Sequence, residues 1–241
     1  MECSLPMNKQ TGGIDSHVQA YYEASIPRQP NGYPNGWMSA KDLTLLYNAA
    51  RKTKGDVLEI GPWLGRSSTA IAAGLRSREE TGAKPVKYDL IDFGLTSAEE
   101  YTERFNERFR VDKDKGRVAE AIYHPGGSMA VLIQNLKSNG LLKQTTNIIR
   151  GDFLECPIER AYGMIFCDAT HDEDEIARHL PKIAELIAPG GILVFDDIVT
   201  DERADLVCSY LNAEFRFMSR QVHPSRSDRC KLLLIETKPT A

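Results

Sequence analysis

The run Val57–Ser68 constrains the fold of this chain more than any other feature. An apolar strand carries an acidic residue, Glu59, and two glycines four positions apart, Gly61 and Gly65, lead from it into a helix. Glycine lets the backbone come close to a ligand, because it has no side chain and tolerates unusual dihedral angles. A strand, a glycine turn and a helix in this order predict an α/β fold with a ligand site at the turn.

The spacing of these glycines excludes two better-known nucleotide motifs. A phosphate-binding P-loop needs Gly-x-x-x-x-Gly-Lys-Ser/Thr, whereas here the spacing is one residue shorter and Arg66 follows the second glycine. The dinucleotide fingerprint needs Gly-x-Gly-x-x-Gly, and Trp63 stands where its second glycine would be. An acidic residue beside the turn favours a ligand that presents hydroxyl groups or a positive charge to the turn. It disfavours a ligand that presents phosphate groups there. The turn therefore predicts a site for a nucleoside with a positively charged tail.

Length and composition indicate one α/β domain with a short extension. The chain has 241 residues, of which 41% are hydrophobic and 27% are charged, as in an ordinary soluble globular protein. A net charge of -4 argues against general nucleic-acid binding. No apolar run reaches the length of a membrane span, and the N-terminus lacks the core of a signal peptide. The five cysteines form no Cys-x-x-Cys pair, so we expect free thiols in a reducing cytoplasm.

Apolar strands and amphipathic helices alternate along most of the chain. We expect strands at 56–60, 86–91, 147–150, 163–167 and 191–195, and a late pair at 215–218 and 231–236. The clearest helices are expected at 40–52, capped by Ser39, and at 172–187, with an acidic start and a Pro-Gly stop. This alternation predicts a doubly wound, mostly parallel, seven-stranded Rossmann-like sheet with helices on both faces.

Two segments fall outside this regular pattern. Residues 1–37, rich in Gly, Pro, Asn and Gln, are predicted to form an N-terminal arm or lid ahead of a single domain at 38–241. The connection at about 97–145 is longer than one crossover requires and is predicted to be an extended segment that forms a substrate wall or an oligomer contact. Arms and long crossovers of this kind favour a homodimer or a higher homo-oligomer, which is the assembly we expect.

Carboxylates follow almost every predicted strand. Ligands bind at the carboxyl ends of the strands in a doubly wound sheet, so these side chains are expected to share one rim. They are Glu59, Asp92, Asp152, Asp168, Asp196 and Asp197. Any one of them is more simply a helix cap, but capping does not explain the whole series. Asp92 is placed to accept the ribose hydroxyls of a nucleoside, and Asp152 to accept an adenine amino group.

Asp168 and the pair Asp196-Asp197 follow neighbouring predicted strands. Three carboxylates so close together repel one another unless a cation lies among them. Oxygen ligands alone favour a hard ion such as Mg²⁺ or Ca²⁺, and no His and Cys residues stand at zinc spacing. The alternative is that Asp196 and Asp197 cap the next helix while only Asp168 touches a ligand. We expect the metal site, with Mg²⁺ or another hard divalent ion.

His171 follows Asp168 by three residues, at the start of the acidic helix. An imidazole titrates near neutrality and can take a proton from a hydroxyl that is held beside a cation. Most lone histidines near a helix start are structural or solvated, but the position above the strand ends favours a general base. His171 and Asp168 are therefore the expected catalytic residues.

Together these motifs resemble a class I S-adenosylmethionine-dependent methyltransferase. The pattern Glu-x-Gly-x-x-x-Gly at 59–65 is similar to the first motif of that class, although Pro62-Trp63 departs from the small residues usual between the glycines. More narrowly, the motif order from Gly36 to about Glu236 resembles the metal-dependent small-molecule O-methyltransferases of the macrocin type.

The resemblance implies a role for particular residues of this chain. It implies S-adenosylmethionine as the cofactor, with contacts at Glu59, Gly61, Gly65, Ser67, Ser68, Asp92, Asp152 and Asp168. It also implies metal ligands at Asp168, Asp196 and Asp197, and a base at His171.

The expected function is methyl transfer to a hydroxyl of a small molecule such as a sugar, a phenol or another natural product. The metal would bind vicinal oxygens of this substrate and lower the pKa of the attacking hydroxyl, and His171 would accept the proton. Two alternatives stay open: a metal-independent N- or C-methyltransferase that uses His171 as base, and a non-catalytic S-adenosylmethionine-binding module. A dehydrogenase is a distant possibility, because the glycine fingerprint is missing. Neither nucleic acid nor a membrane is an expected partner.

Overall fold

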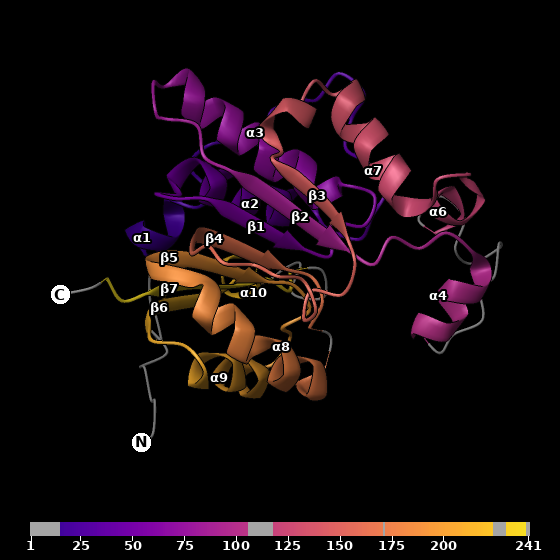
Figure 1. Cartoon of the computed structure of the whole chain (residues 1–241). Helices are drawn as coiled ribbons and strands as arrows, with labels where there is room; N and C mark the ends of the chain where they lie inside the picture. The colour runs from indigo at the N-terminus through magenta and orange to yellow at the C-terminus, as the bar shows by residue number, and fades with distance from the viewer. Residues whose placement is uncertain (1–14, 106–117, 171, 224–229, 240–241) are drawn as a thin grey trace.

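The computed structural model describes residues 15–105, 118–170, 172–223 and 230–239, which form one seven-stranded sheet with helices around it (Figure 1). The strands are β1 (Val57–Ile60), β2 (Tyr88–Asp92), β3 (Asn147–Arg150), β4 (Tyr162–Cys167), β5 (Ile187–Phe195), β6 (Ala213–Met218) and β7 (Leu233–Thr237). Their order is β3-β2-β1-β4-β5-β7-β6, and every pair is parallel except those of β7 with β5 and with β6. The predicted doubly wound, mostly parallel sheet is confirmed.

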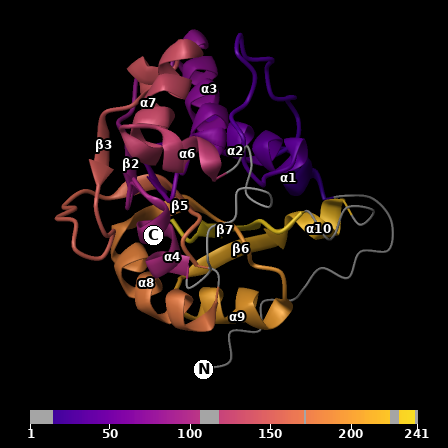
Figure 2. The ribbon, with the colours of Figure 1, turned by 90° about the vertical axis from the view of Figure 1, so that its right-hand side faces the viewer.

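Helices cover both faces of this sheet, as both views show (Figures 1 and 2). The longer helices are α2 (Ala40–Lys52), α3 (Arg66–Glu80), α7 (Gly127–Ser138), α8 (Glu173–Leu186) and α9 (Asp201–Ser209). Helices α2, α3 and α7 lie over one face, and α8 and α9 lie over the other. The short elements are α1 (Ser16–Gln19), α4 (Ala98–Phe105), α6 (Ala119–Tyr123), η1 (Leu142–Gln144) and α10 (Ser219–Val222).

Successive side chains of the central strands supply two separate cores. In β4, Met164 and Phe166 pack with the face that α2 and α3 cover, whereas Ile165 and Cys167 pack with the face that α8 and α9 cover. All six residues of β4 are buried. A strand covered on both sides has no need of polar residues, which explains why the chain shows continuous apolar runs rather than alternation.

Local capping signals set the start of the two helices that were clearest in the sequence. Helix α2 begins after Ser39, whose Oγ accepts a hydrogen bond from the amide of Asp42 at 3.2 Å while the carboxylate of Asp42 accepts from the amide of Ser39 at 3.3 Å. Helix α8 begins after Asp172, whose carboxylate accepts from the amide of Glu175 at 2.8 Å. Both helices were predicted to within a residue of these ends.

The connection from α8 to β5 differs from the expectation. Strand β5 begins at Ile187, four residues before the predicted start at Gly191. The Pro-Gly segment therefore lies inside the strand, where the pairing with β4 shifts register between Tyr162 and Met164. Helix α8 ends at Leu186, one residue before the predicted end, and β5 follows it directly.

The two irregular segments of the sequence both rest on the domain. In the N-terminal segment, Val18 and Tyr21 are buried in the core. Arg66 of α3 holds the same segment, since its guanidinium donates to the carbonyl of Met38 at 2.9 Å and to that of Pro34 at 2.8 Å. In the extended segment, α4 and α6 lie beyond the carboxyl ends of β2 and β3 (Figure 1).

Two findings bear on the environment expected for the chain. The cysteines of the described part, Cys156, Cys167, Cys208 and Cys230, are buried, and no disulfide joins any two of them. Among the described residues, no helix combines the length and the apolar character needed to cross a membrane.

Gly61 is the point at which the ends of β1 and β4 touch. Its φ is 83°, and a Cβ atom added there would lie 2.6 Å from the carbonyl oxygen of Asp168. The amide of Asp168 donates to the carbonyl of Ile60 at 2.9 Å, and the amide of Gly61 donates to that of Ile91 at 2.9 Å, so backbone pairing holds the turn on both sides. A residue with a side chain fits neither this conformation nor this space.

We expect Gly61→Ala to lower the free energy of unfolding by about 2–5 kcal/mol, which adds the cost of a left-handed alanine to that of overpacking. Gly82→Ala is the matched control, because Gly82 has a φ of 88° but nothing within 4 Å of an added Cβ. The control is expected to cost only the backbone term of about 1–2 kcal/mol. Urea denaturation measures both, and equal losses would contradict a packing requirement at Gly61.

Candidate active site

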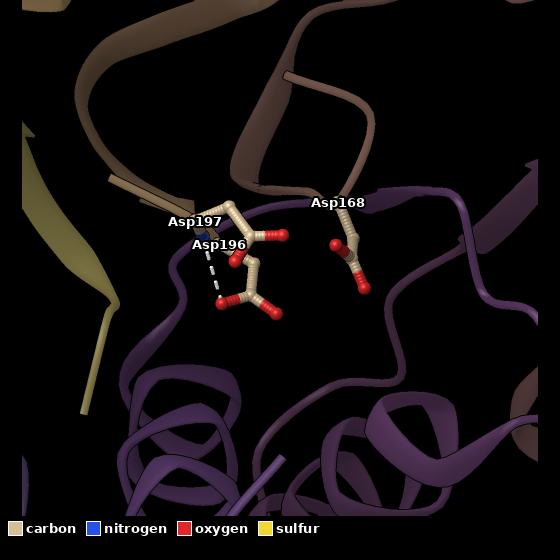
Figure 3. A group of neighbouring side chains, drawn as sticks. All are labelled: Asp168, Asp196 and Asp197. Atoms are coloured by element: carbon tan, nitrogen blue, oxygen red, sulfur yellow. Dashed lines mark hydrogen bonds between the residues drawn. The ribbon is translucent and has the colours of Figure 1, made fainter. Parts of the chain in front are cut away.

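Three carboxylates gather at the carboxyl ends of β4 and β5 (Figure 3). One carboxylate oxygen from each of Asp168, Asp196 and Asp197 lies within 4.8 Å of the others. The two strands are parallel neighbours with Cys167 opposite Phe195, so the residues that follow them reach the same edge. The amide of Asp196 also donates to the carbonyl of Cys167 at 2.9 Å, which continues the pairing into the turn. The structure thus brings these three predicted site residues together.

Two strained residues lie at this same edge of the sheet. Trp63, with a φ of 51°, and Asp197, with a φ of 62°, are the non-glycine residues of the described ranges that have a positive φ. Trp63 follows β1 by three residues and Asp197 follows β5 by two. Such a conformation costs about 1–2 kcal/mol for an ordinary residue and persists where the surroundings impose it, often at ligand sites. Both of these residues with a positive φ thus lie at the edge of the sheet that carries the carboxylate cluster, which supports this edge as the functional one.

Lys231 is the member of the cluster that sequence reasoning missed. Its ammonium lies 3.5 Å from a carboxylate oxygen of Asp196 and donates a hydrogen bond to Asp197. Strand β7 is antiparallel to β5, with Leu233 opposite Phe195. Continuing this register by two residues places Lys231 opposite Asp197. The signal was therefore the direction of β7, because only an antiparallel strand brings its beginning to the rim where the other strands end.

Burial and mutual repulsion set the protonation of the cluster. Burial, followed by the charges of Asp196 and Asp197, raises the pKa of Asp168 well above its ordinary value. Burial also raises the pKa of Asp196 to about 6, against the lowering effect of Lys231. For Lys231, burial lowers the pKa, but the attraction of these carboxylates outweighs it and the pKa is raised overall. One ammonium thus only partly compensates three carboxylates.

Glu59 lies beneath the glycine turn, fully buried. One carboxylate oxygen accepts a hydrogen bond from the hydroxyl of Ser67 at 2.5 Å, and the other accepts from the hydroxyl of Tyr88. Burial, opposed by these hydrogen bonds, raises the pKa of Glu59. In this arrangement Glu59 ties the first turn of α3 to β2, and a ligand could reach it only if these bonds opened. The contacts predicted for Glu59, Ser67 and the equally buried Ser68 stay predictions.

Asp92 holds the glycine turn from the end of β2. Its carboxylate accepts a hydrogen bond from the amide of Gly94 at 2.7 Å and another from the amide of Trp63 at 3.1 Å. Burial raises the pKa of Asp92 in spite of these two bonds. The side chain is therefore beside the turn, where the sequence placed the sugar of a nucleoside, and this assignment stays a prediction.

Asp152 stands two residues beyond the end of β3, on the same rim. The amide of Gly151 donates to the carbonyl of Asp92 at 2.9 Å and so extends the pairing of β2 with β3 towards it. The guanidinium carbon of Arg104, on α4, lies 3.0 Å from the centre of the Phe93 ring. Burial lowers the pKa of Arg104, and the charge of Asp152 opposes this effect. Helix α4 thus brings the positively charged side chain of Arg104 to the side of the rim on which the nucleoside is expected.

The predicted base, His171, lies outside the described residues, so its role stays a prediction. Asp168, the other predicted catalytic residue, is a member of the carboxylate cluster. Its backbone borders Gly61, which places the expected catalytic position next to the glycine turn.

A family of methyltransferase domains matches residues 58–198, more than half of the chain. The chain belongs to this methyltransferase family. The match begins in β1 and ends just after Asp197, so it includes both the glycine turn and the carboxylate cluster. The predicted resemblance to class I S-adenosylmethionine-dependent methyltransferases is confirmed.

Solved structures of other methyltransferases share the fold. The glycopeptide N-methyltransferase MtfA, complexed with sinefungin, has a TM-score of 0.51 at 10% identity, over 89% of this chain and 100% of that one. The N-methyltransferase NodS from Bradyrhizobium japonicum WM9 has a TM-score of 0.50 at 14% identity, over 83% of this chain and 96% of that one. The O-methyltransferase TM0748 from Thermotoga maritima reaches 0.49 at 16% identity, over 83% of this chain and 66% of that one. A search of curated protein sequences found no match.

The stability of the metal-free methyltransferase is expected to fall as the pH rises from about 4 to about 7. A carboxyl whose pKa is raised by folding binds its proton more tightly in the folded chain, so the stability it adds is lost as the pH rises through the folded value. For Asp196, the difference between 3.8 and about 6 corresponds to at most about 3 kcal/mol. Urea denaturation in the presence of a chelator measures this trend.

Two variants test whether Asp196, rather than another acidic residue, causes the pH dependence of the stability. Asp196→Asn removes the titrating group and is expected to flatten the pH dependence. Asp174→Asn, on the exposed side of α8, is the matched control and is expected to leave it unchanged. An Asp196→Asn protein with the pH dependence of the wild type would contradict the assignment.

Proposed function

We propose that this methyltransferase transfers a methyl group from S-adenosylmethionine to a hydroxyl of a small molecule, with the help of a divalent ion. The observation that carries the metal half is the gathering of carboxylate oxygens from Asp168, Asp196 and Asp197 within 4.8 Å. Membership of the methyltransferase family supports the reaction class. A sugar, a phenol or another natural product is the acceptor class that the sequence resemblance suggests.

The chemistry of the cluster fits a hard divalent ion. Its donors are carboxylate oxygens, which Mg²⁺ and Ca²⁺ prefer, and waters and acceptor oxygens would complete the coordination. Asp196 is only 3% exposed, and a buried carboxylate needs a compensating charge. Three carboxylates meet here, and the single ammonium of Lys231 balances the charge of only one of them. We therefore propose Asp168, Asp196 and Asp197 as the ligands of Mg²⁺.

The remaining residues of the rim would bind and position the reactants. The turn at Gly61 and Gly65 lets the backbone approach the donor, and Asp92 and Asp152 offer acceptors for its hydroxyl and amino groups. The donor supplies an already activated methyl group, so most of the rate gain comes from holding the two reactants in line. A bound divalent ion lowers the pKa of an oxygen it contacts, and His171 would take up the released proton.

A metal-independent N- or C-methyltransferase is the second candidate, and one observation favours it. Lys231 already places a positive charge against Asp196 and Asp197 without any ion. In this alternative the carboxylates and His171 would orient a nitrogen or carbon acceptor. The two candidates differ in whether removal of metal stops turnover.

Chelation is expected to separate methyl transfer from cofactor binding. With radiolabelled S-adenosylmethionine and a panel of catechols and vicinal diols, EDTA should lower transfer on the order of 100-fold or more, because the charge that activates the hydroxyl is lost. Binding of S-adenosylhomocysteine, measured by calorimetry, should persist in EDTA. Added Mg²⁺ should restore transfer.

The variant Asp197→Asn tests without a chelator whether methyl transfer needs the metal site. Asparagine tolerates the left-handed backbone that residue 197 adopts, so the fold should survive while one ligand charge is lost. The variant should lose transfer and keep S-adenosylhomocysteine binding, whereas Asp174→Asn should match the wild type. Full transfer in EDTA would reject the metal half of the proposal, and failure to bind S-adenosylhomocysteine would reject the donor.

A further inference from the structure

We propose that Lys231 is a built-in counter-cation of the carboxylate cluster, which a divalent ion displaces when it binds. This inference rests on the metal half of the proposed function and assigns the cluster a second state. In one state the ammonium of Lys231 compensates Asp196 and Asp197, and in the other the divalent ion does. Lys231 then sets how tightly the ion binds.

The contacts of Lys231 coincide with the proposed metal ligands. Its ammonium lies 3.5 Å from Asp196 and donates to Asp197, so it contacts two of the three carboxylates that the ion would need. The side chains of Lys231, Asp196 and Asp197 are 20%, 3% and 30% exposed, so water screens these charges only partly. Two cations this close to the same carboxylates repel each other, and the interaction is strong where solvent is scarce.

The backbone beside Lys231 is held in place by hydrogen bonds between Leu232 and Ser219. The neighbouring Leu232 is fully buried, its amide donates to the hydroxyl of Ser219 at 3.0 Å, and its carbonyl accepts from the amide of Ser219 at 2.8 Å. Lysine carries its charge on a flexible four-carbon stem. We therefore expect the ammonium to leave the cluster by rotation of the side chain, without movement of β7.

The carboxylate of Asp196 and the backbone of the turn that carries it have hydrogen bonds that do not involve Lys231. The amide of Asp197 donates to the carboxylate of Asp196 at 2.8 Å, and the main-chain bond from Asp196 to Cys167 fixes the turn. The positive φ of Asp197 is likewise a backbone property. Removal of the ammonium should therefore leave Asp196 and the backbone of the turn in place and remove a competing charge. This distinguishes a competitor from a residue that positions the ligands.

Binding of Mn²⁺ to the full chain, measured from the paramagnetic resonance signal of the free ion, tests the inference. We expect Lys231→Met to bind Mn²⁺ at least about tenfold more tightly than the wild type, because the competing charge is gone. Lys231→Arg keeps a positive charge and should bind no more tightly than the wild type. Lys84→Met, which removes an exposed lysine between α3 and β2, is the control for net charge and should bind as the wild type does.

Thermal unfolding supplies a second readout. In EDTA, Lys231→Met should melt below the wild type, because Asp196 has lost its counter-ion, and Mn²⁺ should raise its melting temperature by more than that of the wild type. Lys231→Gln, which is neutral but can still donate hydrogen bonds, should show the same two effects and replaces Lys231→Met if that protein does not fold.

The outcomes separate this inference from the proposed function. Equal or weaker Mn²⁺ binding by the neutral variants, with measurable binding by the wild type, would overturn the role of Lys231 and leave the metal site standing. No Mn²⁺ binding by the wild type, Lys231→Met or Lys231→Gln would overturn the metal half of the proposed function and the inference with it.

Discussion

The backbone pairing that continues past the ends of the central strands is the constraint on which the site depends. Three amides, those of Gly61, Asp168 and Asp196, each donate to a carbonyl of the neighbouring strand at 2.9 Å, after regular strand structure has ended. These bonds bring the turns after β1, β4 and β5 to a common edge, so that side chains far apart in sequence meet there. Gly61 is needed at this junction because the carbonyl of Asp168 occupies the space where a side chain would lie.

The chemistry of the rim follows from charges that this pairing forces together. Burial and mutual repulsion raise the pKa values of Asp168 and Asp196, which means that the folded chain keeps these carboxylates in a state that a cation would relieve. Lys231 supplies one such charge from a strand that runs the other way. In the proposed function, the same fold therefore provides both a site for a divalent ion and a competitor for that ion. In the proposed function, methyl transfer depends on positioning between the side of the rim at Asp92 and Asp152, where the nucleoside is expected, and the acidic side at β4 and β5.

The segments outside the regular pattern build the surroundings of this rim. Trp63 of the glycine turn packs against a cluster formed by Leu95, Tyr101, Val118 and Ile122, which belongs to the extended segment. Seen towards the carboxyl edge, α4 lies in front of the sheet (Figure 2). The bulky residue between the two glycines, unusual for the family that the sequence resembles, is therefore one of the contacts between the glycine turn and the extended segment. The prediction that this segment forms a substrate wall or an oligomer contact stays a prediction.

The sequence by itself determined the alternation of strands and helices, the cap of α2 at Ser39 and the gathering of Asp168, Asp196 and Asp197. These features follow from local periodicity, from short-range hydrogen bonds and from the rule that parallel strands end at one edge. Only the tertiary structure decided that β5 begins at Ile187, that the hydroxyl of Tyr88 donates to the carboxylate of Glu59, and that Lys231 faces Asp197. Each of these depends on which strand lies beside which, in which direction and in which register. Those are relations between segments separated by long stretches of chain, and no local pattern records them.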